Sequence, residues 1–332
     1  MSATDAGRLR LQVRVSSKTM VAQDICALEL VAALGDALPA FAAGAHIDLY
    51  LPGGWVRQYS LCNPPGETSR YLIAVLRDPA SRGGSAAVHE QLHPGDLLTI
   101  STPRNLFALR PGAGPTTPPR LLLAGGIGLT PLLAMAQALH EADEPFTLHV
   151  ATRSAARTPF RELLLAGRLA PHVQLHHDDG PATQRLDLDR VLTSPPTHAQ
   201  LYLCGPGGFI AAATHTARRH GWSEAQIVVE SFGIRPSPST DSTDMPFELE
   251  LAHSRRVVPV APGQTAVQAL AAVGVTVPVS CEQGICGTCV LPVLAGEPDH
   301  RDQYLTPQER ADNRCFTPCC SRAKSTRLVV AL

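Results

Sequence analysis

The chain has 332 residues, of which 44% are hydrophobic, and it carries a formal net charge of −1 with an isoelectric point of about 6.9. Length and composition are typical of a globular protein with about two or three domains. The near-neutral charge argues against nucleic acid or an anionic membrane as the main partner.

The number of cysteines and the lack of long apolar runs indicate the cellular compartment of the protein. The first 13 residues contain no apolar run typical of a signal peptide, and no stretch of about 18 apolar residues predicts a membrane span. Nine cysteines are present, and six of them follow residue 280. An odd number of cysteines crowded at one end favours a metal site in a reducing compartment over disulfides. We therefore expect a cytoplasmic protein.

Residues 8–110 are predicted to be all-β, because short apolar runs alternate there with Gly/Pro turns. Two motifs stand out. RQYSL, residues 57–61, begins one of the expected strands. RGGS, residues 82–85, precedes an expected helix over 86–92, and free backbone N–H groups at a helix start predict an anion site. A serine that merely caps the helix is the alternative.

A Pro/Gly-rich linker at 111–119 separates this region from one in which strands and helices alternate. The spacing of these elements predicts a parallel sheet. We expect a strand, a glycine turn and a helix across 121–142, strands within 146–153, 173–179, 199–205 and 227–233, and helices within 160–168 and 206–221.

The turn GGIGLTP, residues 125–131, follows the first of these strands. Gly125, Gly126 and Gly128 allow a dinucleotide pyrophosphate to approach the backbone closely, and Thr130 can cap the next helix. Pro131 stands where the GxGxxG fingerprint has its last glycine. A purely structural turn therefore remains an alternative.

A second turn, CGPGGF at 204–209, also follows a strand and opens a helix. Cys204 ends its strand at the sheet edge where ligands gather in such folds. A strand-end cysteine that belongs only to the core is the alternative. The last strand of this region is expected to end at Phe232.

A Pro/Ser/Thr-rich spacer at 234–244 marks a further domain boundary. The segment beyond it is predicted to be a small α+β domain. We expect a hairpin over 247–263, a helix over 265–274 and a final strand within 327–332.

Cysteines dominate this last domain. Cys281, Cys286 and Cys289 have four and then two residues between them, which is the plant-type 2Fe-2S spacing. Gly284 and Gly287 lie between these ligands and bring amide groups close to the sulfurs. A zinc site is the rival, but such sites usually have two CxxC pairs, and the loop has one. The candidates for the fourth ligand are Cys315, Cys319 and Cys320.

Taken in order, these motifs resemble the phthalate dioxygenase reductase family, and within it the reductases of vanillate O-demethylase type, over essentially the whole length. RQYSL and RGGS resemble the flavin and flavin-phosphate motifs, and LLLAGGIGLTP and YLCGPGGFI resemble the two nicotinamide-dinucleotide turns. CEQGICGTC with CCSRA resembles the C-terminal ferredoxin, and GEPDHRDQYLTPQER also resembles family members. Because the family's fourth cysteine precedes x-S-R-A, the resemblance implies Cys319 as ligand and Cys320 as its neighbour.

The resemblance implies three domains. They are an FMN-binding antiparallel β-barrel at 7–112, an α/β parallel-sheet NAD-binding domain at 117–232 and an α+β ferredoxin domain of the β-grasp type at 244–332. Arg57, Tyr59 and Ser60 are implied to hold the flavin, with Gly84 and Ser85 at its phosphate. A surface ion pair is the alternative for Arg57.

The remaining implied roles concern the nucleotide and the cluster. Cys204 is implied to lie near the nicotinamide and Phe232 to cover the flavin ring, with a plain core residue as the alternative for Phe232. The implied nucleotide-binding residues are Gly125, Gly126, Gly128, Thr130, Gly205 and Pro206. The implied cluster ligands are Cys281, Cys286, Cys289 and Cys319.

The implied activity is an electron relay. A flavin is needed between a nicotinamide, which gives a hydride, and a cluster, which accepts single electrons. The resemblance implies NADH, FMN and a 2Fe-2S cluster in a monomer that serves a terminal oxygenase, of Rieske type and acting on an aromatic acid. The alternatives are a reductase for a cytochrome P450 or a ferric acceptor, and an iron–sulfur redox sensor.

The residues leave the choice between NADH and NADPH open. Arg153, Ser154 and Arg157 follow the second strand of the expected parallel sheet, where arginine can meet a 2′-phosphate. Asp178 and Asp179 follow the third strand and can instead meet a ribose. The family resemblance favours NADH.

Overall fold

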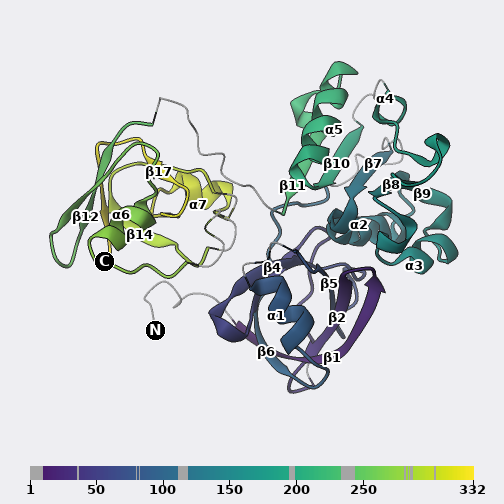
Figure 1. Cartoon of the computed structure of the whole chain (residues 1–332), viewed down its shortest axis with the longest axis horizontal. Coiled ribbons are helices and arrows are strands. Elements are labelled where there is room, and N and C mark those ends of the chain that lie inside the picture. Colours follow the sequence, from purple (N-terminus) through teal and green to yellow (C-terminus); the bar gives the residue numbers. More distant parts are fainter. Residues whose placement is uncertain are drawn as a thin grey trace. The chain divides into compact units, whose positions relative to one another are not determined.

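The computed structural model of the chain contains two compact units (Figure 1). The larger unit holds residues 10–53 and 59–233, and the smaller holds the C-terminal segment from residue 234 together with 54–58. The expected linker and spacer, apart from residues 119 and 244, lie outside the described residues. The described residues are 10–35, 37–79, 81, 83–110, 119–193, 199–232, 244–279, 282, 284, 287–302 and 304–332.

A six-stranded sheet is formed mainly by the first part of the larger unit. Its strands are β1 (Arg10–Ala22), β2 (Ile25–Ala32), β3 (His46–Tyr50), β4 (Val56–Ser60), β5 (Tyr71–Leu76) and β6 (Leu97–Ser101), in the order β4-β3-β6-β1-β2-β5. β1 pairs antiparallel with β2 and β6, and β2 pairs antiparallel with β5. Just after β4, the backbone N–H of Cys62 donates to the carbonyl of Leu72 in β5 over 2.9 Å. The two ends of the sheet therefore meet, and the predicted barrel-like fold is confirmed.

The helix α1 (Gly84–Gln91) is held at its C-terminal end by Lys18 of β1. The Lys18 ammonium donates to the carbonyl oxygens of Val88, His89 and Leu92 over 3.0, 2.6 and 2.9 Å. Carbonyls at this end of a helix lack intrahelical partners and carry the negative pole of the helix dipole. Lys18 therefore fixes α1 from the end opposite to its first residues.

A five-stranded parallel sheet forms the rest of the larger unit, as predicted. Its strands are β7 (Arg120–Gly125), β8 (Phe146–Thr152), β9 (Val173–His177), β10 (Gln200–Gly205) and β11 (Ile227–Ser231), in the order β11-β10-β7-β8-β9. The helices are α2 (Leu129–Glu141), α3 (Arg161–Ala166), α4 (Leu188–Val191) and α5 (Gly207–Arg219). Short 3-10 turns are η2 (Pro52–Gly54), η3 (Gly126–Gly128), η4 (Ala155–Arg157), η5 (Ala170–His172), η6 (Ala182–Gln184) and η7 (Glu224–Gln226).

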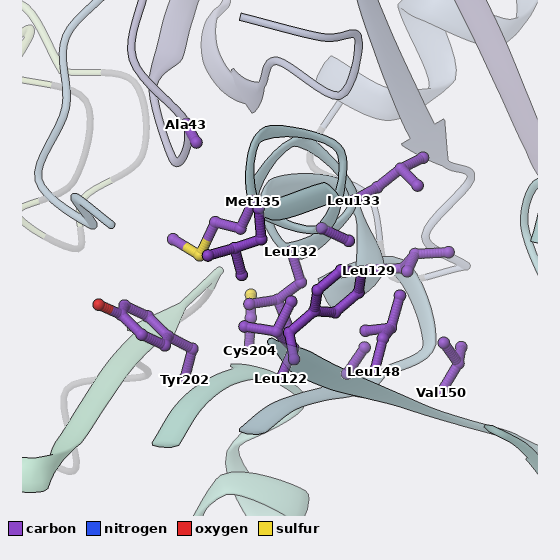
Figure 2. Close-up of a cluster of buried hydrophobic side chains, with 14 of the residues drawn as sticks. Ala43, Leu122, Leu129, Leu132, Leu133, Met135, Leu148, Val150, Tyr202 and Cys204 are labelled. Carbon is purple, nitrogen blue, oxygen red and sulfur yellow. The ribbon is translucent and has the colours of Figure 1, made fainter. Parts of the chain in front are cut away.

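Helices cover both faces of this parallel sheet. Leu122 and Tyr202 point to the α2 face, where they meet the buried residues of that helix (Figure 2). Leu123 and Leu203, one residue further along their strands, point to the α5 face. This burial on both faces explains why the strands are continuously apolar in sequence.

The barrel and the parallel sheet share a core. Ala43, Cys62 and Phe107 of the barrel region belong to the same buried cluster as the α2 face of the parallel sheet. Across the same junction, the side-chain amide of Gln137 donates to the Cys62 carbonyl over 2.8 Å, and the Tyr202 hydroxyl accepts from the backbone N–H of residue 110 over 2.8 Å. The two sheets are therefore packed as one unit.

The smaller unit is an α+β fold with its own core, as predicted. Its strands are β12 (Phe247–Leu251), β13 (Val257–Val260), β14 (Leu291–Ala295), β15 (Pro298–Asp299), β16 (Cys315–Phe316), β17 (Arg322–Ala323) and β18 (Arg327–Val330). Its helices are α6 (Ala266–Ala272) and α7 (Pro307–Ala311). β12 and β13 form the expected hairpin, and β18 pairs parallel with β12. None of the helices in the described part of the chain has the length and apolar character that crossing a bilayer requires.

Candidate functional site

The first glycine turn lies at the carboxyl end of β7, the edge where open parallel sheets bind ligands. Gly125 ends β7, and Gly126 and Gly128 bound the turn η3. Gly126 has φ of +57°, which suits glycine. Thr130 lies inside the first turn of α2, where its hydroxyl donates to the carbonyl of Ile127 over 3.0 Å. Because Gly128 occupies the cap position, the expected cap at Thr130 is wrong.

The second turn packs directly on the first. A Cβ on Gly128 would lie 2.3 Å from the carbonyl oxygen of Cys204. A Cβ on Gly205 would lie 3.0 Å from the Cα of Gly125, and one on Gly125 would lie 3.0 Å from Cδ of Pro206. The structure therefore brings the two predicted turns into backbone contact, and packing alone requires glycine at three of these positions.

The start of α5 faces open space. Pro206 precedes the helix without a side-chain cap, and a Cβ on Gly207 or Gly208 would meet no atom of the described chain within 4 Å. Gly126 of the first turn is equally open in the described structure. Free backbone N–H groups at the positive end of a helix favour an anion. A pyrophosphate therefore fits between these two turns.

A buried thiol and a carboxyl group lie at the same edge of the sheet. Cys204 is fully buried, and its Sγ lies 4.0 Å from Oε2 of Glu230, which is its register partner in β11. Burial raises the pKa of Cys204, and the charge of Glu230 raises it further. Desolvation raises the pKa of Glu230 to about 8.

Phe232 follows directly after β11 and is 44% exposed, so the alternative of a plain core residue is excluded. Glu230, two residues before it, was missed by the reasoning from sequence. The available signal was a single acidic residue at the carboxyl end of an otherwise apolar strand.

The residues expected at the flavin lie on β4. Ser60 is buried, and Arg57 and Tyr59 are half-buried. The Arg57 guanidinium lies 5.1 Å from the centroid of the Trp55 ring and donates to the carbonyl of Val56 over 2.9 Å. Stacking on an aromatic ring holds the guanidinium in place. In the larger unit, β5, the next strand in the chain, contacts η3, so the barrel approaches the first glycine turn.

The start of α1 has the features of an anion site. Gly83 has φ of +105° and stands before Gly84 as a cap without a side-chain hydrogen bond. Ser85 does not cap the helix, since its hydroxyl accepts from the backbone N–H of Asp78 over 3.2 Å. The capping interpretation of Ser85 is therefore wrong. Arg82, the first residue of the motif, lies outside the described residues.

Two of the predicted cluster ligands lie in one core. Cys289 and Cys319 are 3% and 4% exposed and belong to the same buried cluster of the smaller unit. Cys315 is half-buried in β16, where it pairs with Pro292 of β14. The remaining predicted ligands, Cys281 and Cys286, lie outside the described residues.

The glycines of the cysteine loop fit a tightly wound cluster site. Gly284 has φ of +70°, and a Cβ there would lie 2.3 Å from Sγ of Cys320. Gly287 has φ of +66°, and a Cβ there would lie 2.0 Å from Cζ of Tyr304. No other residue type fits this backbone in this space. The donor set and the loop therefore suit a 2Fe-2S cluster.

Comparisons with known proteins agree with this geometry. Residues 249–324 match the 2Fe-2S iron-sulfur cluster binding domain. A vanillate O-demethylase oxidoreductase of Pseudomonas sp. (strain HR199) is 49% identical over 322 residues, which cover 97% of this chain and 100% of that protein. The solved structure of phthalate dioxygenase reductase is 34% identical, covers 100% of both chains and has a TM-score of 0.71. The chain belongs to the phthalate dioxygenase reductase family.

A second solved structure extends the comparison. An intact type IV self-sufficient cytochrome P450 monooxygenase is 37% identical with a TM-score of 0.80, and this reductase spans 41% of that longer chain. The family and the fold class predicted from sequence are confirmed: a flavin-binding barrel, a parallel-sheet nucleotide domain and a C-terminal 2Fe-2S domain. This reductase is therefore an oxidoreductase of the kind that serves multicomponent oxygenases.

Proposed function

We propose that this reductase carries electrons from NADH through FMN and a 2Fe-2S cluster to a terminal Rieske-type oxygenase or demethylase acting on an aromatic acid. The observation that carries the proposal is the 49% identity, over the full length, to an oxidoreductase named for vanillate O-demethylation. We place the domain boundaries at 7–112, 117–232 and 244–332. The protein acts as a monomer in the cytoplasm, where its cysteines stay reduced.

The bound flavin supplies the chemistry that joins a two-electron donor to a one-electron acceptor. Arg57, Tyr59 and Ser60 on β4 would hold the flavin ring, and Gly84 and Ser85 at the start of α1 would bind its phosphate. Gly83 has no side chain that could cover this end of α1, and the hydroxyl of Ser81 accepts from the N–H groups of Gly83 and Ala86 over 3.2 and 3.5 Å, not from those of Gly84 and Ser85.

The two glycine turns bind the dinucleotide. The backbone N–H groups of these turns would bind the pyrophosphate, because a Cβ at Gly126 would meet nothing within 4 Å in the described structure and so leaves room for it. Cys204 would lie near the nicotinamide, and the exposed ring of Phe232 would cover the flavin ring. In the smaller unit, the cluster ligands are Cys281, Cys286, Cys289 and Cys319.

NADH is the donor rather than NADPH. Arg157, one of the arginines available to a 2′-phosphate, forms an ion pair with Asp24 over 3.0 Å. The backbone N–H of Asp179 donates to the carbonyl of Arg153 over 3.1 Å, which places residue 179 beside the end of β8, where an acidic residue can meet a ribose. Comparing kcat/KM for the two cofactors tests the choice, and a preference for NADPH contradicts it.

The order of electron transfer is tested with Cys286→Ser. We expect NADH to bleach the flavin of this variant as in the unmodified protein, while cytochrome c reduction stops. Loss of both reactions contradicts the proposed order. Sustained NADH-dependent cytochrome c reduction by the unmodified protein also excludes a mere redox sensor, which has no use for turnover.

A cytochrome P450 is the second candidate acceptor, because the reductase is similar along 97% of its length to part of a self-sufficient P450. The two candidates separate in a reconstituted assay. Mixed with NADH, vanillate and the oxygenase component of a vanillate O-demethylase, the reductase is expected to support release of the demethylated product. Turnover with a P450 and none with the oxygenase favours the second candidate.

A further inference from the structure

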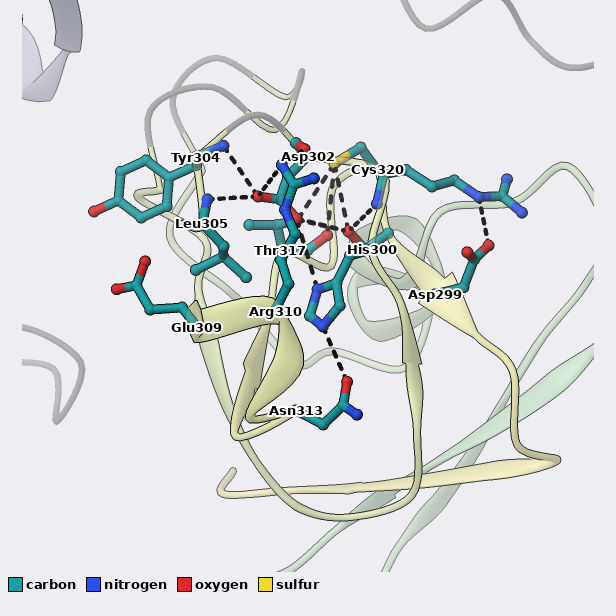
Figure 3. Close-up of polar contacts among 12 residues, drawn as sticks. Asp299, His300, Asp302, Tyr304, Leu305, Glu309, Arg310, Asn313, Thr317 and Cys320 are labelled. Carbon is teal, nitrogen blue, oxygen red and sulfur yellow. Dashed lines mark hydrogen bonds and ion pairs between the residues drawn. The ribbon is translucent and has the colours of Figure 1, made fainter. Parts of the chain in front are cut away.

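A buried carboxylate lies beneath the cysteine loop. The side chain of Asp302 has no exposed surface. Its Oδ2 accepts from the backbone N–H groups of Tyr304 and Leu305 over 3.0 and 2.7 Å (Figure 3). The guanidinium of Arg310 lies 3.8 Å from the same oxygen. Burying a carboxylate is unfavourable unless its oxygens are satisfied, so these contacts hold Tyr304 and Leu305 firmly to Asp302.

The second carboxylate oxygen reaches the segment that follows Cys319. The hydroxyl of Ser321 donates to Oδ1 of Asp302 over 3.4 Å. Ser321 also contacts the Thr317 hydroxyl over 2.8 Å, and that hydroxyl lies 3.3 Å from Sγ of Cys320. Thr317 and Ser321 are fully buried. The network therefore links the segment between the third and fourth ligands to the turn that carries the fourth.

The residues held by this network are in close contact with the two glycines of the cysteine loop, Gly284 and Gly287. A Cβ on Gly284 would lie 2.3 Å from Cys320 Sγ and 2.9 Å from the Asp302 Cα. A Cβ on Gly287 would lie 2.0 Å from the ring of Tyr304, whose backbone N–H binds Asp302. Both glycines alternate with the predicted ligands Cys281, Cys286 and Cys289 in the chain. A shift of Asp302 therefore displaces both contact surfaces of the loop together.

We propose that Asp302 is a positioning residue for the cluster loop: it holds Tyr304 and Cys320 against the two glycines and so fixes the spacing of the four thiolates. This inference rests on the cluster ligands proposed above. A carboxylate that only stabilises the fold lowers the unfolding temperature without changing the cluster in the folded protein. A positioning carboxylate changes how tightly the folded protein holds iron.

The test compares Asp302→Ala and Asp302→Asn with Asp312→Ala, which removes an exposed acid of the same unit. Iron release from the oxidised full-length protein to an added chelator is followed by absorbance, and the cluster's EPR spectrum is recorded after reduction. Changes behind metal ligands typically alter metal affinity by about 10- to 100-fold. We expect Asp302→Ala to release iron at least about 10-fold faster, with a shifted EPR spectrum.

The other variants sharpen the result. Asp302→Asn retains an oxygen that can accept from both backbone N–H groups, so its release rate is expected to lie between those of the unmodified protein and Asp302→Ala. Asp312→Ala is expected to match the unmodified protein. The inference is overturned if Asp302→Ala releases iron at the unmodified rate with an unchanged spectrum, or if Asp312→Ala has the same effect.

A substitute variant and the iron content of the unmodified protein complete the test. If Asp302→Ala does not fold, Ser321→Ala replaces it, because this change keeps the carboxylate and its two backbone partners but removes the link to the turn after Cys319. Ser321→Ala is then expected to release iron faster, and an unmodified rate refutes the positioning role. Failure of the unmodified protein to bind iron contradicts the ligand assignment instead, so the two proposals fail in different ways.

Discussion

Replacing Gly128 with alanine tests whether the contact between the two nucleotide turns is obligatory. The added methyl group would lie 2.3 Å from the carbonyl oxygen of Cys204, 2.4 Å from its carbonyl carbon and 2.7 Å from the nitrogen of Gly205. Carbon atoms in ordinary contact are about 3.5–4.0 Å apart, so the turns must separate by roughly 1 Å. β10 is hydrogen-bonded to β7 and β11 on either side and has little freedom to move.

The expected cost follows from this overlap. Overpacking of this kind costs about 1–3 kcal/mol and occasionally more. Because the added methyl group contacts backbone atoms that cannot move away, we expect Gly128→Ala to cost about 3 kcal/mol. For domains of roughly 150–250 residues, that cost lowers Tm by about 6–12 °C. We also expect a higher KM for NADH, because the turn that binds the pyrophosphate is displaced.

Differential scanning calorimetry of the purified reductase measures the effect. Gly208→Ala is the matched control, because in the described structure a Cβ there would meet nothing within 4 Å and the position lies in α5. Alanine can adopt the helical backbone at this second position of α5 and restricts the unfolded chain more than glycine does, so the Tm of Gly208→Ala is expected to stay equal or rise slightly. Equal unfolding temperatures for Gly128→Ala and the unmodified protein would refute the reasoning.

Three further predictions concern single side chains. Because desolvation raises the pKa of Glu230 to about 8, the folded protein retains this proton above pH 5, where the unfolded chain loses it. Tm is therefore expected to fall between about pH 5 and 8 more steeply in the unmodified protein than in Glu230→Gln, and parallel curves contradict this. Lys18→Met is expected to cost about 1–3 kcal/mol in urea unfolding and to weaken FMN binding, because three carbonyls of α1 lose a charged donor; unchanged unfolding refutes it. Cys319→Ser is expected to abolish the cluster absorbance and Cys320→Ser to retain it, and the reverse result makes Cys320 the ligand.

The sequence predicted the elements of the fold because their signals are local. The apolar strands and the glycine turns at 125–131 and 204–209 can be predicted from spacing alone, and the strands expected in the parallel sheet were found. The short elements α4, α7 and β14 to β17 were not predicted. The contact of Gly128 with the backbone of Cys204 could not be predicted from sequence, because it joins residues 76 positions apart in the chain. Local patterns therefore place the turns, and only tertiary packing explains why they contain glycine.

The errors at the candidate site have the same origin. Thr130 and Ser85 were given capping roles because both lie near helix starts, but Ser85 binds Asp78 and Thr130 binds Ile127 instead. Glu230 has no motif of its own and becomes notable only beside the buried Cys204. Hydrogen-bond partners of short polar side chains and the desolvation of a carboxylate depend on neighbours that sequence periodicity does not specify.

The core shared by the barrel and the parallel sheet limits how the protein can be divided. Phe107 and Cys62 are buried against residues of the α2 face, so a fragment that ends near residue 110 would expose an apolar surface to water. The C-terminal unit has a buried core made of its own residues. An engineered fusion that redirects the electrons to a different acceptor should therefore be joined after Phe232. Such a fusion keeps the barrel and the parallel-sheet domain together.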